Sequence, residues 1–409
     1  MNDATASPPP AIPGARGGLA LLAVVTGVAV ANLYYAQPLA AMMADSLHVG
    51  AGALGFALML SQIGYALGML LLVPLGDGRE RRGLMVTAAL ASAVALLLLS
   101  VVPSYPALAA VSLILGFASC LPQMAVPFAV GLVPPEQRGH AIGVVMGGLL
   151  AGILLSRTAS GVITSVVGWR ATFALAAGLM GLTAAVIRLA LPVQRPPQPL
   201  AWRTILASLF QVVRSEPILR RQAVVGAFGF AAFSTFWSTL SFHLARLGYG
   251  SKTAGLFGVI GVVGVAVAPI VGRLAGRVRP TLINQVGLAA VLAGFVVFGA
   301  GAHSLVRLGL GVVLLDAGVQ ASHLANQTIV FGLNPTLRNR LNAVYMVTYF
   351  VGGALGTAAA ALAWERAGWT GVSILGAVLA ACGQLPLLAH ERRDGGAGER
   401  RGEPRAAHR

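Results

Sequence analysis

Apolar runs about twenty residues long recur along this chain, and they constrain its fold more than any other feature. Roughly 20 apolar residues in a helix cross a hydrocarbon core of about 30 Å. Such runs lie at about 18–43, 50–74, 83–102, 107–132, 140–167, 171–191, 222–246, 252–275, 281–302, 305–331, 341–364 and 369–389. Glycine and proline inside several runs are compatible with membrane helices, because neighbouring helices satisfy the freed backbone groups. The sequence therefore predicts an all-α membrane protein with twelve transmembrane helices.

The composition excludes the soluble classes of protein. Hydrophobic residues make up 57% of the chain and charged residues 10%, whereas soluble domains have about 45–50% and about 25%. A soluble enzyme, a disordered protein and a coiled coil are therefore excluded. Both cysteines, Cys120 and Cys382, lie in apolar runs and provide neither a disulfide framework nor the spacing of metal ligands. We expect no metal and no cofactor.

Basic residues are distributed unevenly between the predicted loops. With the N-terminus in the cytoplasm, 22 of the 28 lysines and arginines fall on the cytoplasmic side and five on the opposite side. This asymmetry predicts that both termini are cytoplasmic. The net charge of +16 is then a consequence of topology, and no nucleic-acid partner is expected. The excess of arginine over lysine favours a bacterial gene, so we predict a multi-pass protein of the bacterial inner membrane.

One longer loop divides the runs into two sets of six. Residues 192–221 are proline-rich and then basic and amphipathic. The stretch from Trp202 to Val213 is either a helix on the cytoplasmic surface or a plain linker. The predicted organisation is an N-terminal tail at 1–17, a six-helix bundle at 18–191, a central linker at 192–221, a second bundle at 222–389 and a basic tail at 390–409.

Related phrases follow the second run of each half. The first contains Asp77, Arg81 and Arg82, and the second contains Gly272 and Arg277. They resemble, in part, the loop signature of the major facilitator superfamily, although Val73 replaces its opening glycine in one copy and Gly276 its acid in the other. The phrases at 32–39, 155–161 and 315–327 are similar to those of bacterial drug and sugar efflux permeases of the arabinose type.

The resemblance implies two pseudo-symmetric six-helix bundles around a central cavity, which work by alternating access. An acid at a helix end can accept from the amides of the next helix and pair with arginines. We therefore predict a conformational latch, made of Asp77, Arg81, Arg82, Gly272 and Arg277. The alternative is that these arginines are ordinary charges of the cytoplasmic side.

Two charged residues are predicted deep inside spans, Arg157 in the fifth and Asp316 in the tenth. An isolated charge in the bilayer costs several kcal/mol, so such residues pair or face water. Each lies about ten residues from the outer face, and the matching depths predict that the two interact in at least one state. Asp316 is then a candidate proton carrier. The alternatives are a fixed structural ion pair and separate local partners for the two charges.

Other polar residues of the spans are candidates for the cavity. Gln320, His323 and Gln327 follow Asp316 on one helix face. The full set is Asn32, Tyr35, Gln37, Gln62, Gln123, Trp237, Gln320, His323, Asn326, Gln327, Tyr345 and Tyr349. Each of them is otherwise explained by a hydrogen bond between helices. Trp169 and Trp369 lie near span ends and are expected to be interfacial anchors.

The fifth span is rich in glycine, at Gly143, Gly147, Gly148, Gly152 and Gly161. Small residues four apart let helices pack closely. In the superfamily, a glycine-rich fifth helix is associated with exporters, although the Gly-Pro pair that usually accompanies it is absent here. Tight packing alone is the alternative explanation.

These features predict a secondary active transporter of a small organic solute, most simply a proton-coupled exporter that works as a monomer. No phosphate-binding GxxxxGK[ST] motif occurs, so the proton gradient is the expected energy source. A proton symporter or a facilitator of the same fold is the closest alternative. A non-transporting sensor and a membrane-embedded lipid enzyme are less consistent with the sequence, and the protein is not expected to be an enzyme.

Overall fold

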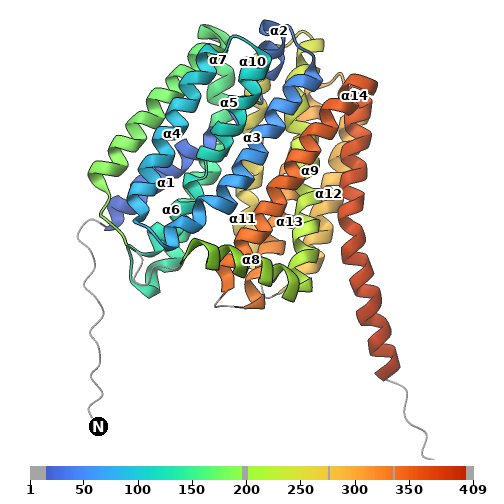
Figure 1. The fold of residues 1–409 in the computed structure, drawn as a ribbon. Helices are drawn as coiled ribbons and strands as arrows, with labels where there is room; N and C mark the ends of the chain where they lie inside the picture. The colour runs from blue at the N-terminus through green and yellow to red at the C-terminus, as the bar shows by residue number, and fades with distance from the viewer. Residues whose placement is uncertain (1–14, 196–200, 275–276, 335–336, 402–409) are drawn as a thin grey trace, which may run out of the picture.

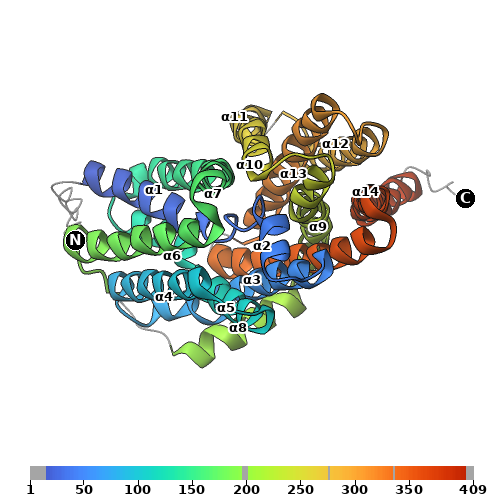
Figure 2. The same cartoon turned by 90° about the horizontal axis from the view of Figure 1, so that it is seen from above.

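The computed structural model describes residues 15–195, 201–274, 277–334 and 337–401. Viewed along the helices, these residues form two groups of helices that stand side by side (Figures 1 and 2). Most of the predicted N-terminal tail and residues 402–409 of the predicted C-terminal tail lie outside the described residues.

The first group of helices contains the first half of the chain. Its elements are α1 (Ala15–Ala31), α2 (Ala40–Ser46), α3 (Ala51–Leu71), η1 (Val73–Asp77), α4 (Arg81–Val101), α5 (Tyr105–Ala118), α6 (Leu121–Val130), η2 (Pro135–Gln137) and α7 (Arg138–Ala190). The helix α8 (Trp202–Ser215) follows and lies across the lower end of the bundle in Figure 1. The stretch from Trp202 is therefore helical, as one of its two interpretations proposed.

The second group contains the rest of the chain. Its helices are α9 (Pro217–Arg246), α10 (Ser251–Ile260), α11 (Val262–Leu274), α12 (Pro280–Ala300), α13 (Leu305–Leu333) and α14 (Arg338–Arg401). Within the described residues, nine helical segments are long and apolar enough to cross a membrane, and the shorter Gly17–Ala31 is also apolar.

Two of these segments each contain two spans. The helix α7 turns back at Gly168, and α14 turns back at Gly368, with φ of +79° and +56°. Glycine adopts positive φ without the steric cost of a side chain, so each chain reversal occurs at a glycine. Because α7 and α14 each contain two spans, the nine long segments correspond to eleven spans. With the shorter apolar segment within α1, the described residues provide the twelve predicted spans.

The two reversals share the dipeptide Gly-Trp, which marks an internal repeat. Trp169 and Trp369 are only 4% and 7% exposed. Their indole nitrogens donate to Ser46 Oγ at 2.9 Å and to the carbonyl oxygen of Phe298 at 3.0 Å. The expectation that these two rings are interfacial anchors is therefore wrong: each ring packs inside the protein beneath its turn.

Several predicted spans are interrupted. The first is non-helical between α1 and α2, the fourth breaks between α5 and α6 around Cys120, and the eighth breaks at Gly261. Non-helical backbone at membrane depth is stable only where it is buried in protein or lines a cavity. Asn32 and Ser119 are both buried, and the Asn32 amide donates to the Ser119 hydroxyl at 3.3 Å, which joins the first two breaks.

One face of the protein carries arginines of the α3–α4 loop and of the first turns of α4, α7 and α14, namely Arg79, Arg82, Arg138, Arg338 and Arg340. This arginine-rich face is at the lower end of Figure 1, where α1 begins and α8 lies. On the opposite face, the two halves meet through small residues of α7 and α10. Ser251 Oγ donates to the carbonyl of Gly161 at 3.2 Å, and Thr158 Oγ1 donates to the carbonyl of Gly255 at 3.0 Å. A Cβ on Gly161 would lie 2.5 Å from the Ser251 carbonyl oxygen. The two backbones are therefore in direct contact, and no side chain fits between them.

A second contact between the halves closes the same face. Gly55 of α3 packs against Ala361 of α14. Glu365 of α14 accepts a hydrogen bond from the Gly52 amide at 2.8 Å, where α3 begins. A carboxylate is stabilised at the N-terminus of a helix by the free amides and the helix dipole. This face is therefore closed on both sides of the interface, by α7 with α10 and by α3 with α14.

The glycines of the fifth span differ in what surrounds them. Gly148 and Gly152 pack against the backbone of α1, and Gly161 packs against α10, whereas no atom lies within 4 Å of a Cβ built on Gly143 or Gly147. The contact across the halves thus depends on Gly161, and Gly147 provides a matched control on the same helix.

We predict that Gly161→Ala opens this face and that Gly147→Ala does not. An overpacked contact costs about 1–3 kcal/mol, which shifts a population ratio by about 5- to 150-fold. Spin labels at the exposed residues Asp45 and Arg366, one in each half on this face, report the separation by double electron–electron resonance. The Gly161→Ala protein should populate longer distances, and an unchanged distribution would contradict the packing role of Gly161.

Candidate functional site

A cavity of about 560 Å³ lies between the two halves. Its walls come from α1, α3, α6 and α7 on one side and from α9, α13 and α14 on the other. It extends to Asp77 at the end of η1, to Arg81 at the start of α4 and to Arg338 and Arg340 at the start of α14, on the arginine-rich face. Two apolar residues of α8, Ile205 and Leu209, also line it. The volume is within the range of small-molecule sites, about 300–1,000 Å³.

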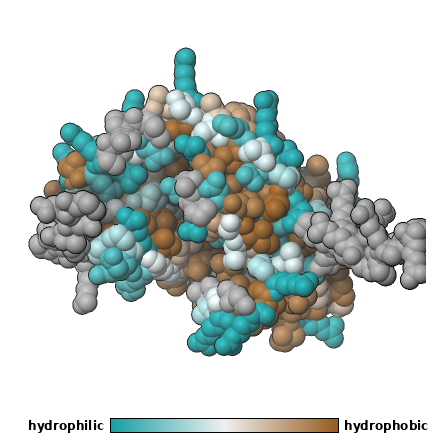
Figure 3. Space-filling model, turned by 90° about the horizontal axis from the view of Figure 1, so that it is seen from below, coloured by the Kyte–Doolittle hydropathy of each residue, from teal (hydrophilic) through white to brown (hydrophobic). Residues whose placement is uncertain are grey.

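The arginine-rich face has a hydrophobic centre and a hydrophilic rim. Figure 3 shows brown side chains in the middle of this face and teal side chains around them. Because the opposite face is closed by the Gly161 and Glu365 contacts, the described residues leave the cavity accessible from the arginine-rich face.

Arg157 and Asp316, the two charged residues predicted inside spans, both line this cavity. They are 2% and 7% exposed. The carbonyl of Arg157 faces Gly255 of the closed interface, so the pair lies at the end of the cavity that is nearest the closed face. The two charged residues that the sequence predicts inside spans therefore lie at the same end of one cavity.

The Arg157 guanidinium is held mainly by an amide and by aromatic rings. Its Nε donates to Gln37 Oε1 at 2.7 Å, in the non-helical segment between α1 and α2. Its central carbon lies 4.1 Å from the ring of Trp237, 4.6 Å from that of Tyr34 and 5.4 Å from that of Phe233. Its buried Nη2 finds no hydrogen-bond partner within the part of the chain that the structure describes. Cation–π contacts of this kind stabilise a desolvated guanidinium by about 2 kcal/mol or more.

Asp316 does not form a direct ion pair with Arg157. Its Oδ1 accepts a hydrogen bond from the indole nitrogen of Trp237 at 3.2 Å. The ion pairs of the described residues lie in the α3–α4 loop, and none within 4.0 Å joins Asp316 to Arg157. Trp237 therefore contacts both charged groups, with its ring face toward one and its N–H toward the other.

The other carboxylate oxygen of Asp316 faces the break between α10 and α11. A Cβ on Gly261 would lie 2.6 Å from Oδ2, and one on Gly264 would contact the backbone of Asp316. A side chain at Gly261 would push the carboxylate out of place, whereas a Cβ at Gly264 would make an ordinary van der Waals contact. The helix break at Gly261 therefore makes the space that Asp316 occupies.

Aromatic rings form one wall of the cavity. Phe230 of α9 stacks on Tyr349 of α14 at 4.2 Å between ring centroids, and Phe233 and Phe350 extend the wall. Sequence reasoning missed Tyr34, Phe230, Phe233 and Phe350. A signal was available on α9, where Phe230, Phe233 and Trp237 have helical spacing and so share a face.

Five of the predicted cavity residues line the cavity. They are Gln123, Gln320, His323, Gln327 and Tyr349. Gln123 donates to the Tyr65 hydroxyl at 3.1 Å, and Gln327 donates to Asn342 at 3.5 Å. The polar face of α13 that starts at Asp316 therefore points into the cavity.

The other seven predicted residues lie outside the lining. They are Asn32, Tyr35, Gln37, Gln62, Trp237, Asn326 and Tyr345. Gln37 and Trp237 contact the two charged residues from behind, and Tyr345 bonds to His323 Nδ1 at 3.0 Å.

The rest of this set join helices to one another. Gln62 bonds to Thr357 across the two halves at 3.0 Å, and Asn326 bonds to Asn284 at 2.7 Å. Tyr35 is buried beside the break in the first span, and its neighbour Tyr34 faces the cavity instead. The interruption of the helix changes which side chain points inward.

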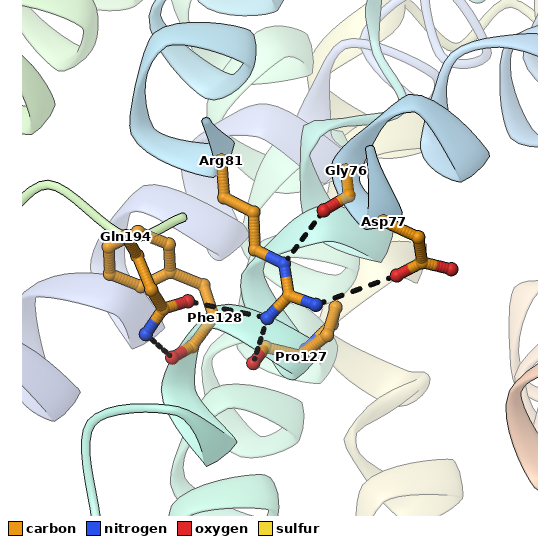
Figure 4. Close-up of polar contacts among 6 residues, drawn as sticks. All are labelled: Gly76, Asp77, Arg81, Pro127, Phe128 and Gln194. Carbon is orange, nitrogen blue, oxygen red and sulfur yellow. Dashed lines mark hydrogen bonds and ion pairs between the residues drawn. The ribbon is translucent and has the colours of Figure 1, made fainter. Parts of the chain in front are cut away.

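The first copy of the predicted latch forms a compact polar cluster around Arg81 (Figure 4). Its guanidinium donates to the carbonyls of Gly76 and Pro127 at 3.1 and 3.3 Å, and to Gln194 Oε1 at 3.4 Å. The ion pair with Asp77, at 3.5 Å, is the longest of these contacts. The cluster therefore ties the α3–α4 loop to α6 and to the segment after α7, all within the first half.

The neighbouring charges cap helix ends. Glu80, and not Asp77, accepts from the Gly83 amide at the start of α4, at 2.9 Å. Arg82 donates to the carbonyl of Leu191 at 3.0 Å, after α7 ends. In the second copy, Gly272 and Arg277 are exposed, and no side-chain partner of Arg277 occurs among the described residues.

Comparison with known proteins gives consistent matches. The family model described as Major Facilitator Superfamily matches residues 19–357. The chain is 38% identical to the uncharacterized transporter YgaY of Escherichia coli O157:H7, over 88% of this chain and 92% of the relative. It is 33% identical to SCO4007 of Streptomyces coelicolor, named a "Probable transporter", over 88% of this chain and 84% of the relative.

Solved structures show the same fold at low sequence identity. A bacterial homolog to the human lysosomal transporter Spinster, in an inward-facing and occupied conformation, matches with a TM-score of 0.74 and 14% identity, over 94% of this chain and 98% of that one. A mutant of the nucleoside transporter NupG matches with a TM-score of 0.71 and 12% identity, over 92% of this chain and 98% of that one.

The Arg81 cluster predicts that the arginine matters more for stability than its ion pair does. Arg81→Lys removes the planar fork that reaches several acceptors and should lower the free energy of unfolding by about 1–3 kcal/mol. Asp77→Asn should lower it by less than about 1 kcal/mol, because the Asp77 side chain is 45% exposed. Thermal unfolding of both variants in detergent checks this order, and a larger effect of Asp77→Asn would contradict it.

Proposed function

Because the chain belongs to the Major Facilitator Superfamily, we propose that it is a secondary active transporter of a small organic solute that works by alternating access. The relatives are named transporters, and the protein is a membrane transporter and not an enzyme. The single observation that carries the proposal is the cavity between the two halves, which is closed on one face and ends at Arg157 and Asp316.

The contacts between the halves favour alternating access. On the closed face they consist of backbone packing at Gly161 and single hydrogen bonds, such as Glu365 to the Gly52 amide. The Arg81 cluster, in contrast, lies within one half and holds that half together. Contacts of the first kind can separate while each half moves as a unit, and repeat-against-repeat motion of this kind moves a central site from one face to the other.

Proton coupling is the energy source that the site favours. Asp316 is a buried acid that lines the cavity, and ionisable residues inside membrane spans commonly belong to proton relays. Its charge interacts with Arg157 through Trp237. A proton that binds to Asp316 therefore changes the net charge at the end of the cavity nearest the closed face. Proton binding can then affect both solute binding and the opening of that face, as coupled transport requires.

Export is the direction that we propose. With the arginine-rich face in the cytoplasm, as the basic residues predict, the cavity receives solute from the cytoplasm. The termini are then cytoplasmic, the protein lies in the bacterial inner membrane, and a monomer suffices because one chain forms the whole cavity. The efflux permeases of the arabinose type, which the sequence resembles, also favour export.

We predict that Asp316→Asn abolishes gradient-driven transport. Proteoliposomes with an imposed pH gradient are tested with a panel of lipophilic cations, sugars and amino-acid analogues. Wild-type protein should move at least one of these against its concentration gradient and stop when a protonophore is added. The variant should fall to the level of protein-free liposomes, because the amide cannot carry the proton.

Asp45→Asn is the control, since Asp45 is an exposed acid of α2 outside the cavity, and it should transport like wild type. Flux that ignores the pH gradient and survives Asp316→Asn would identify a facilitator instead. Solute uptake in the same direction as the proton would identify a symporter.

A further inference from the structure

We infer that Trp237 is the positioning residue that transmits the charge state of Asp316 to Arg157, and so to the contact between the two halves. This inference rests on the proposed proton coupling and assigns its structural link. It concerns a residue that does not line the cavity and therefore does not contact the solute from its wall.

Trp237 and Asp316 form one unit within the second half. The indole nitrogen donates to Asp316 Oδ1 at 3.2 Å, and Trp237 is only 2% exposed. Phe236 meets the indole edge-on at 5.3 Å between centroids, and Phe233 lies at 6.1 Å. The ring is thus confined by its neighbours, and the bond to Asp316 selects its orientation.

Arg157 and its hydrogen bonds belong to the first half. Its guanidinium donates to Gln37 and to the carbonyl of Ile153. The second half contributes ring faces, Trp237 at 4.1 Å and Phe233 at 5.4 Å. The contact between the Arg157 guanidinium and the second half is therefore a cation–π contact, and its nearest ring is the one that Asp316 orients.

Protonation of Asp316 weakens this arrangement. An ionised carboxylate accepts a charge-assisted hydrogen bond, which is about twice as strong as a neutral one. A neutral Asp316 holds the Trp237 N–H less firmly, and the ring is then freer to leave the guanidinium. Because Arg157 and Gly255 touch at the closed face, loss of the ring contact loosens the interface there.

Other titratable groups around Asp316 are few. Arg157 approaches from α7, Tyr34 from the segment between α1 and α2, Tyr349 from α14, and His323 lies on α13 itself. The sides of Asp316 that face α10 and α11 meet Gly261 and Gly264. The helix α12 carries no titratable residue. Among these groups, Asp316 is the one that accepts the hydrogen bond of the Trp237 N–H. Protonation of Asp316 therefore changes the strength of that bond directly.

The test compares the pH response of the closed face in matched variants of the full chain. Spin labels at Asp45 and Arg366 report opening in liposomes at a series of pH values. Trp237→Phe keeps a ring over Arg157 and removes the N–H, so it isolates the bond to Asp316. Trp202→Phe is the matched control, because Trp202 of α8 also donates its indole N–H, to the carbonyl of Leu71 at 3.0 Å, and does not line the cavity.

We expect wild type and Trp202→Phe to shift between closed and open distributions as pH falls. Trp237→Phe should reduce the pH-induced change in the population ratio by about tenfold, the effect of losing one charge-assisted bond. Asp316→Asn should remove the change, and adding Trp237→Phe to Asp316→Asn should then have no further effect. Trp237→Tyr, whose donor lies at another position, serves if the phenylalanine variant does not fold.

A full pH response in Trp237→Phe, together with its loss in Asp316→Asn, would overturn the role of Trp237 and leave the proposed coupling intact. An absence of any pH response in wild type would overturn both the coupling through Asp316 and the role of Trp237. Equal losses in Trp202→Phe and Trp237→Phe would show that the effect is not specific to the bond with Asp316, and would also overturn the inference.

Discussion

The burial of one arginine and one aspartate inside the membrane is the constraint on which the rest of this structure depends. Charges in a low dielectric must be compensated, and here the compensation is not a direct ion pair. Arg157 is held by Gln37 and by aromatic rings, and Asp316 by the N–H of Trp237. Among the described residues, the Nη2 atom of Arg157 has no hydrogen-bond partner. A site of this kind can respond to a proton or a solute.

The helix breaks follow from the same constraint. The non-helical segment between α1 and α2 carries both Gln37 and Tyr34 to Arg157. The break at Gly261 provides the space for the Asp316 carboxylate. The glycines of α7 serve a different purpose: Gly161 lets the backbones of the two halves touch, so the closed face forms directly beside the charged pair.

The sequence predicted the twelve spans, the all-α fold and the two buried charges, because each depends on the length or polarity of a local segment. It predicted less well which side chains enter the cavity. The face of α13 from Asp316 to Gln327 was predicted correctly, since that helix is continuous. The choice of Tyr35 over Tyr34, and the role of Trp169 as an anchor, both failed. The first depends on an irregular backbone and the second on packing beneath a turn, and neither leaves a periodic pattern.

Trp237 illustrates why the link between the two charges was not visible from the sequence. It was named as one polar cavity residue among several, whereas the structure places it behind the wall, in contact with both Arg157 and Asp316. Matching depth in the bilayer predicted that these charges meet, but depth carries no information on what lies between them. An indole can join the two groups because its face attracts a cation while its edge donates a hydrogen bond. Since its two partners belong to different halves, this one ring connects the charge of the acid to the interface that must open.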